Sequence, residues 1–196
     1  MKINKNVFPL LPNRLYFMPI NAIAVFCGSK KGNNPLYIQH ARALGKIFVQ
    51  HNIMLIYGGG STGIMGAIAD AVMENNGKVT GVIPRVLVDW EHQHENITEL
   101  LIVDNMHTRK MKLYELCDAA VILPGGFGTL DELFEMLTWN QLAIHNKPIF
   151  IINSAGFYNS LISHMRNFEE DGFLYDELDK RIKILDEPSQ FVQYLL

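Results

Sequence analysis

The chain has 196 residues, of which 48% are hydrophobic and 19% charged, a balance typical of one globular domain with a sizeable core. Its formal net charge of −3 gives no electrostatic reason to expect nucleic acid or a membrane as a partner, and no run approaches the roughly 18 apolar residues of a membrane helix. The two cysteines, Cys27 and Cys117, are not spaced as a disulfide framework and favour a reducing, cytoplasmic location. We therefore expect a small-molecule partner.

Residues 1–20 are partly apolar, but prolines and Arg14 interrupt them and no small-residue cleavage site follows. This pattern does not fit a signal peptide. We expect an N-terminal extension over residues 1–20, packed on the domain surface or on a second subunit, and one nucleotide-binding catalytic domain over residues 21–196.

From residue 21 onward, short apolar runs alternate with amphipathic segments. The expected strands are residues 22–26, 53–57, 79–83, 101–103, 119–123, 148–152 and 182–185. Helices are expected between them, among them residues 35–51, 106–117 and 130–143. Such alternation with short connections predicts an α/β fold: one doubly wound, Rossmann-like, mainly parallel sheet with helices on both faces. Ligands bind such sheets at the carboxyl ends of the strands.

Two glycine-bearing loops follow the first two expected strands. The first contains Gly28 and Ser29, and the second matches the dinucleotide fingerprint Gly58-x-Gly60-x-x-Gly63. A dinucleotide site also needs an acidic residue at the end of the next strand, where this chain has Arg85. A mononucleotide therefore fits better than NAD. The alternative is a tight strand-to-helix turn that packs on the sheet and binds nothing.

A third loop after the strand at residues 119–123 carries the strongest signal. Its glycines at 125, 126 and 128 can adopt positive φ and let a ligand approach the backbone. Thr129 is the expected N-cap of the following helix, whose free N–H groups and dipole attract an anion such as phosphate. Glu132 would lie beside that anion. The alternative is that Thr129-x-x-Glu132 is only a capping box.

A carboxylate beside phosphate needs a compensating cation, and Arg109 and Lys110 are the candidates. They lie early in the helix expected at residues 106–117, just before the strand that leads to Glu132. Arginine offers a planar fork for phosphate or ribose oxygens. The alternative for Arg109 is a solvated basic face, which we prefer for Lys112.

Three motifs together resemble the Lonely Guy family, the cytokinin-activating phosphoribohydrolases long mislabelled as lysine decarboxylases. They are Gly58-Gly-Gly-x-x-Gly63-x-Met-Gly66, Met106-His-x-Arg109-Lys110 and Pro124-Gly-Gly-x-Gly-Thr-x-x-Glu132. The resemblance runs from about residue 21 to the C-terminus. It implies that Arg109 and Glu132 are the catalytic pair, that the glycine turn binds the 5′-phosphate, and that the protein is a homodimer.

The implied reaction is hydrolysis of the N-glycosidic bond of an N6-modified adenosine 5′-monophosphate, with AMP itself as the other candidate substrate. From the three loops and the resemblance we expect substrate contacts at Gly28, Ser29, Gly59, Gly60, Met65, Glu91, Lys110, Gly125, Gly126, Phe127, Gly128, Thr129 and Thr138. The bond would break through an oxocarbenium-like ribose, which the Glu132 carboxylate can stabilise while it orients the attacking water. Arg109 is too basic to be a good proton donor and would hold phosphate or ribose.

Other chemistries fit the sequence less well. No lysine has a convincing context for pyridoxal phosphate, so no cofactor is expected. His92-x-His94 beside Glu91 could ligate a metal, but the segment is polar and indicates a loop. Cys27 could be a nucleophile, although a buried thiol is the commoner fate. The leading alternative function is a nucleotide or molybdenum-cofactor carrier on the same fold.

The helix expected at residues 130–143 is apolar around more of its circumference than one buried stripe requires. Its apolar residues are Leu133, Phe134, Met136, Leu137, Trp139 and Leu142. This pattern favours a homodimer in which a second copy covers part of the helix. The alternative is that helices of the same subunit cover it.

Overall fold

The computed structural model describes residues 20–88 and 92–195. Within them, seven strands form one sheet in the order β4-β3-β2-β1-β5-β6-β7, and every neighbouring pair is parallel. The strands are β1 (Ala22–Phe26), β2 (Met54–Tyr57), β3 (Val79–Pro84), β4 (Glu99–Val103), β5 (Ala119–Ile122), β6 (Ile149–Ile152) and β7 (Lys183–Leu185). The helices are α1 (Leu36–Gln50), α2 (Gly63–Glu74), α3 (Met106–Leu116), α4 (Phe127–Gln141), α5 (Asn159–Glu170) and α6 (Leu178–Arg181). Short 3₁₀ segments are η1 (Arg85–Leu87), η2 (Ser154–Gly156) and η3 (Pro188–Tyr194).

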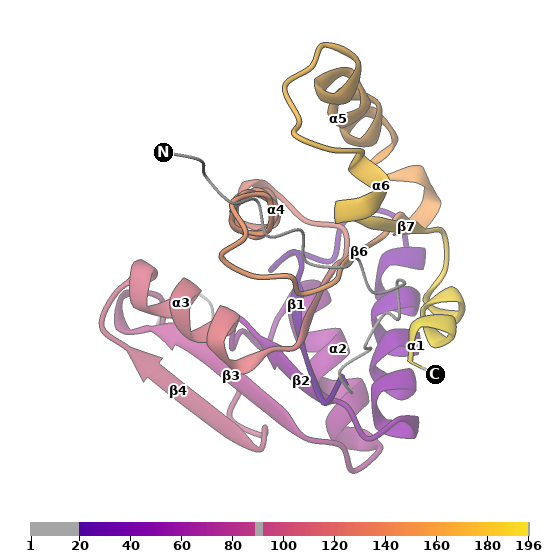
Figure 1. The fold of residues 1–196 in the computed structure, drawn as a ribbon. Helices are drawn as coiled ribbons and strands as arrows, with labels where there is room; N and C mark the ends of the chain where they lie inside the picture. Colours follow the sequence, from indigo (N-terminus) through magenta and orange to yellow (C-terminus); the bar gives the residue numbers. More distant parts are fainter. Residues whose placement is uncertain (1–19, 89–91, 196) are drawn as a thin grey trace, which may run out of the picture.

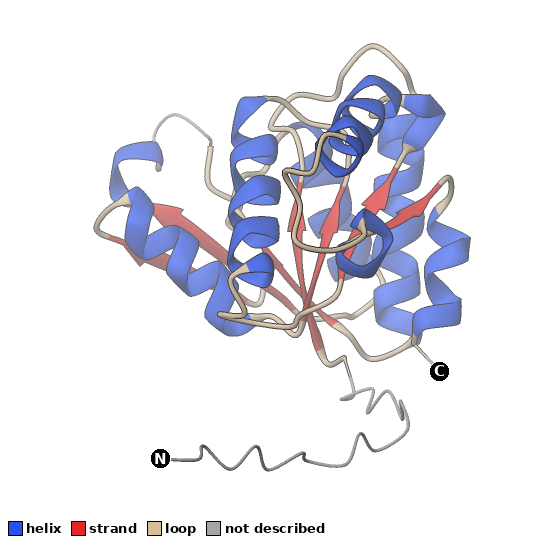
Figure 2. Ribbon diagram, turned by 45° about the horizontal axis from the view of Figure 1, so that its top comes forward, coloured by secondary structure: helices blue, strands red, loops and turns tan. Residues whose placement is uncertain are grey.

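Helices cover both faces of the sheet (Figures 1 and 2). The residues of β1 alternate between two cores: Ile23 and Val25 pack with α1 and α2, whereas Ala24 and Phe26 pack with α3, α4 and α5. All five residues of β1 are buried, which explains its continuous apolar sequence. The expected doubly wound parallel sheet is confirmed.

The direction of winding reverses at the centre of the sheet. From β1 the chain proceeds through β2 and β3 to β4 on one side, and then returns to β5 beside β1 and proceeds to β7 on the other. The loops after β1 and β5 therefore diverge at this switch point, where open α/β sheets bind ligands.

The edge strand β4 begins at Glu99, two residues earlier than the sequence indicated. Glu99 pairs with Thr80 of β3, yet its side chain is exposed, and Ile102 is 48% exposed. The strand thus starts with a charged residue at the open edge of the sheet, ahead of the apolar run at residues 100–103 that marks a strand in the sequence.

The N-terminal extension proposed at residues 1–20 lies outside the described residues except for Ile20, which packs partly buried against the core around Ile23. In the part of the chain that the structure describes, no helix is both long and apolar enough to cross a bilayer.

Candidate active site

The three glycine-bearing loops meet at the switch point. The N–H of Gly28 donates to the carbonyl of Pro124 at 3.0 Å, which joins the loops after β1 and β5. The carbonyl of Gly28 accepts from the N–H groups of Ile64 and Met65, at 3.0 and 3.3 Å, which adds the start of α2, directly after the loop that follows β2. A cavity of about 240 Å³ lies between these loops and the starts of α3 and α4.

The cavity is lined by residues from four parts of the chain. Its described lining is Val25, Phe26, Cys27, Gly28, Ser29, Gly58, Met65, Met106, Arg109, Gly126, Phe127, Gly128, Thr129, Asp131 and Glu132. The residues proposed as catalytic from the sequence, Arg109 and Glu132, thus face one cavity from two different helices.

Helix α4 begins earlier than expected, and this changes the interpretation of Glu132. Gly126 is the N-cap, in an extended conformation, and Thr129 is the third helical residue, 4% exposed. The prediction that Thr129 is the N-cap is therefore wrong, because Gly126 takes that position and the helix starts at Phe127, three residues before the expected start. Glu132 lies in the second turn, beyond the reach of a capping box, so the capping-box alternative is also wrong.

The glycines of this turn serve a steric purpose. Gly125, Gly126 and Gly128 can adopt positive φ, but none of them does so in the described chain. A Cβ on Gly125 would run into the side chain of Thr129 and lie 2.9 Å from the nitrogen of Gly28. A Cβ on Gly126 or Gly128 would have no described atom within 4 Å, so these two positions open onto the cavity.

The N-termini of α2 and α4 both lie at the site, and they differ in whether protein atoms accept hydrogen bonds from their first N–H groups. The first N–H groups of any α-helix lack partners within the helix. Those of α2 donate to the carbonyl of Gly28, so a protein atom already holds the place of an anion. This favours the tight-turn interpretation of the loop at residues 58–63. Gly58 and Met65 line the cavity, whereas Gly59 and Gly60 are buried away from it. The start of α4, in contrast, lines the cavity with Phe127, Gly128 and Thr129.

Arg109 is buried beside the cavity with a residue exposure of 6%. Helix α3 starts at a sequence-encoded cap, since the side chain of Asn105 accepts from the N–H of Thr108 at 3.0 Å. One turn on, a terminal nitrogen of Arg109 donates to the carbonyl of Gly58 at 3.2 Å. The alternative of a solvated basic face is therefore wrong for Arg109. It describes Lys112, which is exposed and pairs with Glu115.

Lys110 links two helices and does not line this cavity. Its ammonium lies 2.7 Å from Asp131 and 3.5 Å from Glu135, both on α4. Burial lowers the pKa of Lys110, but the hydrogen bonds and negative charges of Asp131 and Glu135 outweigh burial, so the pKa is raised. A permanently charged Lys110 thus fixes the start of α3 against α4.

Cys27 forms part of the cavity wall. Burial raises the pKa of this thiol, and the negative charge of Glu132 raises it further. The thiolate needed for nucleophilic attack is therefore not formed near neutral pH. Glu132 lines the same cavity as Cys27, the residue that directly follows β1.

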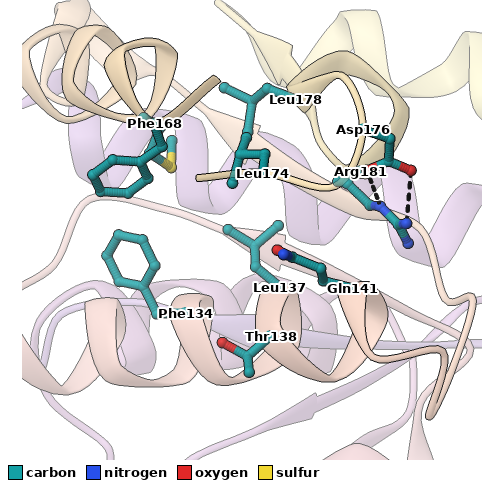
Figure 3. A pocket seen from close by; sticks show the side chains of 10 residues that line it. Phe134, Leu137, Thr138, Gln141, Phe168, Leu174, Asp176, Leu178 and Arg181 are labelled. Carbon is teal, nitrogen blue, oxygen red and sulfur yellow. Dashed lines mark hydrogen bonds and ion pairs between the residues drawn. The ribbon is translucent and has the colours of Figure 1, made fainter. Parts of the chain in front are cut away.

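Three candidate positions remain, Glu91, Thr138 and His94. Glu91 falls outside the described residues, and Thr138 lines a separate groove of about 180 Å³ between α4, α5 and α6 (Figure 3). Both ring nitrogens of His94 are engaged, one with Asp70 and one with the N–H of Asn96. Over residues 20–88 and 92–195, no three His, Cys, Asp or Glu side chains group closely enough to hold a metal.

Sequence reasoning missed Met106 and Asp131 as wall residues of the cavity. Both were within reach of the motifs: Met106 opens the Met-His-x-Arg-Lys motif, and Asp131 immediately precedes Glu132. Asp131 is the more informative omission, since it puts a second carboxylate at the cavity while it pairs with Lys110.

A switch-point cavity lined by the start of a helix, a buried guanidinium and a carboxylate is typical of Rossmann-like proteins that bind small anionic ligands. The family profile described as "Possible lysine decarboxylase" matches residues 65–195. The cytokinin riboside 5′-monophosphate phosphoribohydrolase LOG1 of Arabidopsis thaliana is 47% identical over 152 residues, covering 78% of this chain and 71% of the relative. LOG2 of the same plant is 41% identical over 173 residues, covering 88% and 81%. This chain belongs to the same family, which confirms the Lonely Guy resemblance.

Solved structures show the fold alone at lower identity. The molybdenum cofactor binding protein of Rippkaea orientalis aligns with a TM-score of 0.66 at 17% identity, over 88% of this chain and 93% of that protein. The Moco carrier protein of Chlamydomonas reinhardtii aligns with a TM-score of 0.64 at 18% identity, over 89% and 97%.

Proposed function

We propose that this protein hydrolyses the N-glycosidic bond of an adenosine 5′-monophosphate, with N6-modified, cytokinin-type nucleotides as the preferred substrates. The products are the free base and ribose 5-phosphate. The observation that carries the proposal is the position of Arg109 and Glu132 on one cavity that also receives the open N-terminus of α4. The names of the plant relatives agree with it.

The phosphate is proposed to bind at the start of α4. The N–H groups of Phe127, Gly128 and Thr129 supply donors at the positive end of the helix dipole. The open space at Gly126 and Gly128 lets phosphate oxygens approach the backbone. Gly28 and Ser29 form the opposite wall.

Glu132 is proposed to act on the ribose. As the bond between C1′ and the base nitrogen breaks, C1′ becomes positively charged, and a nearby carboxylate stabilises that charge. Glu132 also orients the attacking water, whose oxygen forms the new bond to C1′. The water gives up one proton, and the base gains one at the nitrogen that was bonded to C1′, so that it departs neutral. Arg109 holds phosphate or ribose oxygens with a guanidinium that never loses its charge.

The protein is further proposed to be a homodimer, with a cytoplasmic location that fits two free, buried cysteines. Leu133 and Met136 of α4 are buried within the chain, and the groove of Figure 3 shows Phe134 and Leu137 facing α5 and α6, so part of the apolar circumference is covered by the same subunit. Beyond α4, Leu142 and Ile144 remain 58% and 57% exposed, and Met111 of α3 is 45% exposed. These side chains supply the surface for a second copy.

The test is to incubate the purified protein with AMP and, separately, with isopentenyladenosine monophosphate, and to measure ribose 5-phosphate. We expect release from both, faster from the isopentenyl nucleotide. Tight nucleotide binding without any ribose 5-phosphate would overturn the hydrolase and support a carrier, the function named for the molybdenum-cofactor proteins of similar fold.

A further inference from the structure

A short segment outside the cavity, residues 92–94, pairs with the glycine loop that ends β2. The N–H of Ser61 donates to the carbonyl of His92 at 2.9 Å, and the N–H of His94 donates to the carbonyl of Gly59 at 2.9 Å. Gly60 and Gln93 form an antiparallel bridge between these two bonds. We call residues 92–94 the latch.

The side chain of His94 fixes the latch from the other side. It is 7% exposed, and its Nδ1 accepts from the N–H of Asn96 at 3.2 Å. A nitrogen that accepts a backbone N–H carries no proton, so this geometry assigns the proton to Nε2, which donates to Asp70 at 3.0 Å. Asp70 belongs to α2, the helix that follows the glycine loop directly. His94 is thus bonded both to α2, through its side chain, and to the glycine loop that precedes α2, through its backbone N–H.

The chain of contacts reaches Gly59, the residue next to Gly58, whose carbonyl binds Arg109. Gly59 adopts φ +84° and packs on β3, where a Cβ added to Gly81 would lie 2.8 Å from its Cα. Its backbone therefore has β3 on one side and the latch on the other. The preceding carbonyl, that of Gly58, accepts from Arg109 at 3.2 Å inside the protein. The direction of that carbonyl depends on how Gly59 is held.

We propose that His94 is a positioning residue for the hydrolase: through Asp70 and the latch it holds the Gly58 carbonyl so that the guanidinium of Arg109 is aimed at the substrate. The inference rests on the function proposed above. A misaligned guanidinium costs affinity and rate, because displacements of about 1 Å in a positioned group reduce rates by up to about a hundredfold.

The test compares His94→Ala with His94→Gln, which keeps an N–H donor toward Asp70, and with Glu74→Gln, a control on the exposed part of α2. Three quantities are measured: hydrogen exchange of the Ser61 amide, calorimetric affinity for AMP, and kcat and KM for the isopentenyl nucleotide. We expect His94→Ala to speed exchange at Ser61, to weaken AMP binding and to lower kcat by about tenfold or more. His94→Gln should recover most of each loss, and Glu74→Gln should change none.

An unchanged rate of hydrogen exchange at the Ser61 amide in His94→Ala would show that His94 does not hold the latch against the glycine loop. Activity lost only in proportion to the unfolded fraction, with no recovery in His94→Gln, would make His94 a purely structural residue and overturn its positioning role. If the unmodified protein releases no ribose 5-phosphate, the proposed hydrolase fails, while exchange and AMP affinity still decide whether the latch positions Arg109.

Discussion

Arg109 and Gly58 lie 51 positions apart in sequence, and the guanidinium of Arg109 donates to the carbonyl of Gly58 at 3.2 Å. This bond crosses from α3 to the end of β2 inside the protein. Burying a guanidinium is unfavourable unless it is hydrogen-bonded, so the carbonyl makes the buried position tenable. The result is a permanent positive charge that water screens little.

The first prediction concerns this charge. Arg109→Ala should weaken the binding of AMP far more than that of adenosine, because a charge-assisted hydrogen bond to the phosphate end is worth roughly 1.5 to 3 kcal/mol. Calorimetry with both ligands checks it. Lys112→Ala is the control, since Lys112 is exposed on the same helix. Equal losses for the two ligands would show that Arg109 does not contact the phosphate end.

The second prediction concerns the carboxylate. Glu132→Gln should leave the fold and AMP binding intact and reduce turnover on the order of 100-fold or more, because it removes the charge that stabilises the oxocarbenium-like ribose. Release of ribose 5-phosphate and thermal unfolding are the measurements. The matched control is Glu135→Gln, one turn further along α4 and paired with Lys110 outside the cavity. Near-normal turnover in Glu132→Gln would remove Glu132 from the mechanism.

The third prediction separates two glycines of one turn. Gly128→Ala should preserve stability and weaken AMP binding, because no described atom opposes the new methyl group except a ligand in the cavity. Gly125→Ala should lower the thermal midpoint, since its methyl would collide with Thr129. Thermal scans with and without AMP distinguish the two effects. A destabilised Gly128→Ala with normal affinity would contradict the proposed phosphate site.

The fourth prediction concerns association. Light scattering should give twice the 22.3 kDa chain mass, and Leu142→Asp should shift the protein toward the monomer, because a charge at this 58% exposed position is costly to bury in an interface. The comparison variant is Tyr175→Asp, at a side chain 81% exposed in the segment between α5 and α6, and it should leave the mass unchanged. A monodisperse, fully active monomer would refute the dimer.

The fifth prediction is independence from metal and pyridoxal phosphate. Activity should survive EDTA, and the purified protein should show no absorbance in the pyridoxal band, because the proposed mechanism uses only charges and hydrogen-bond donors of the chain. Loss of activity in EDTA that zinc restores would contradict it.

The sequence was sufficient to predict the sheet and to predict that Arg109 and Glu132 lie at the same cavity. Both follow because parallel strands bring their carboxyl ends to a common edge. It was not sufficient where tertiary contacts decide. The two glycine loops look alike locally, yet only the fold shows that the Gly28 carbonyl fills the start of α2 and not the start of α4. Likewise, the cap preference of Thr129 is a local signal, whereas the N-cap of α4 in the fold is Gly126, three residues earlier. The burial of Arg109 could not be predicted either, because the basic residues around it, Lys110 and Lys112, are also typical of an exposed helix face.

Phe127 lines the cavity although it is 95% exposed. A side chain that buries so little area contributes little to folding, since stabilisation by apolar groups scales with the area removed from water. Replacements at this position can therefore alter the mouth of the cavity without any repair of the core. The shape of the cavity entrance and the stability of the fold are thus separable at Phe127.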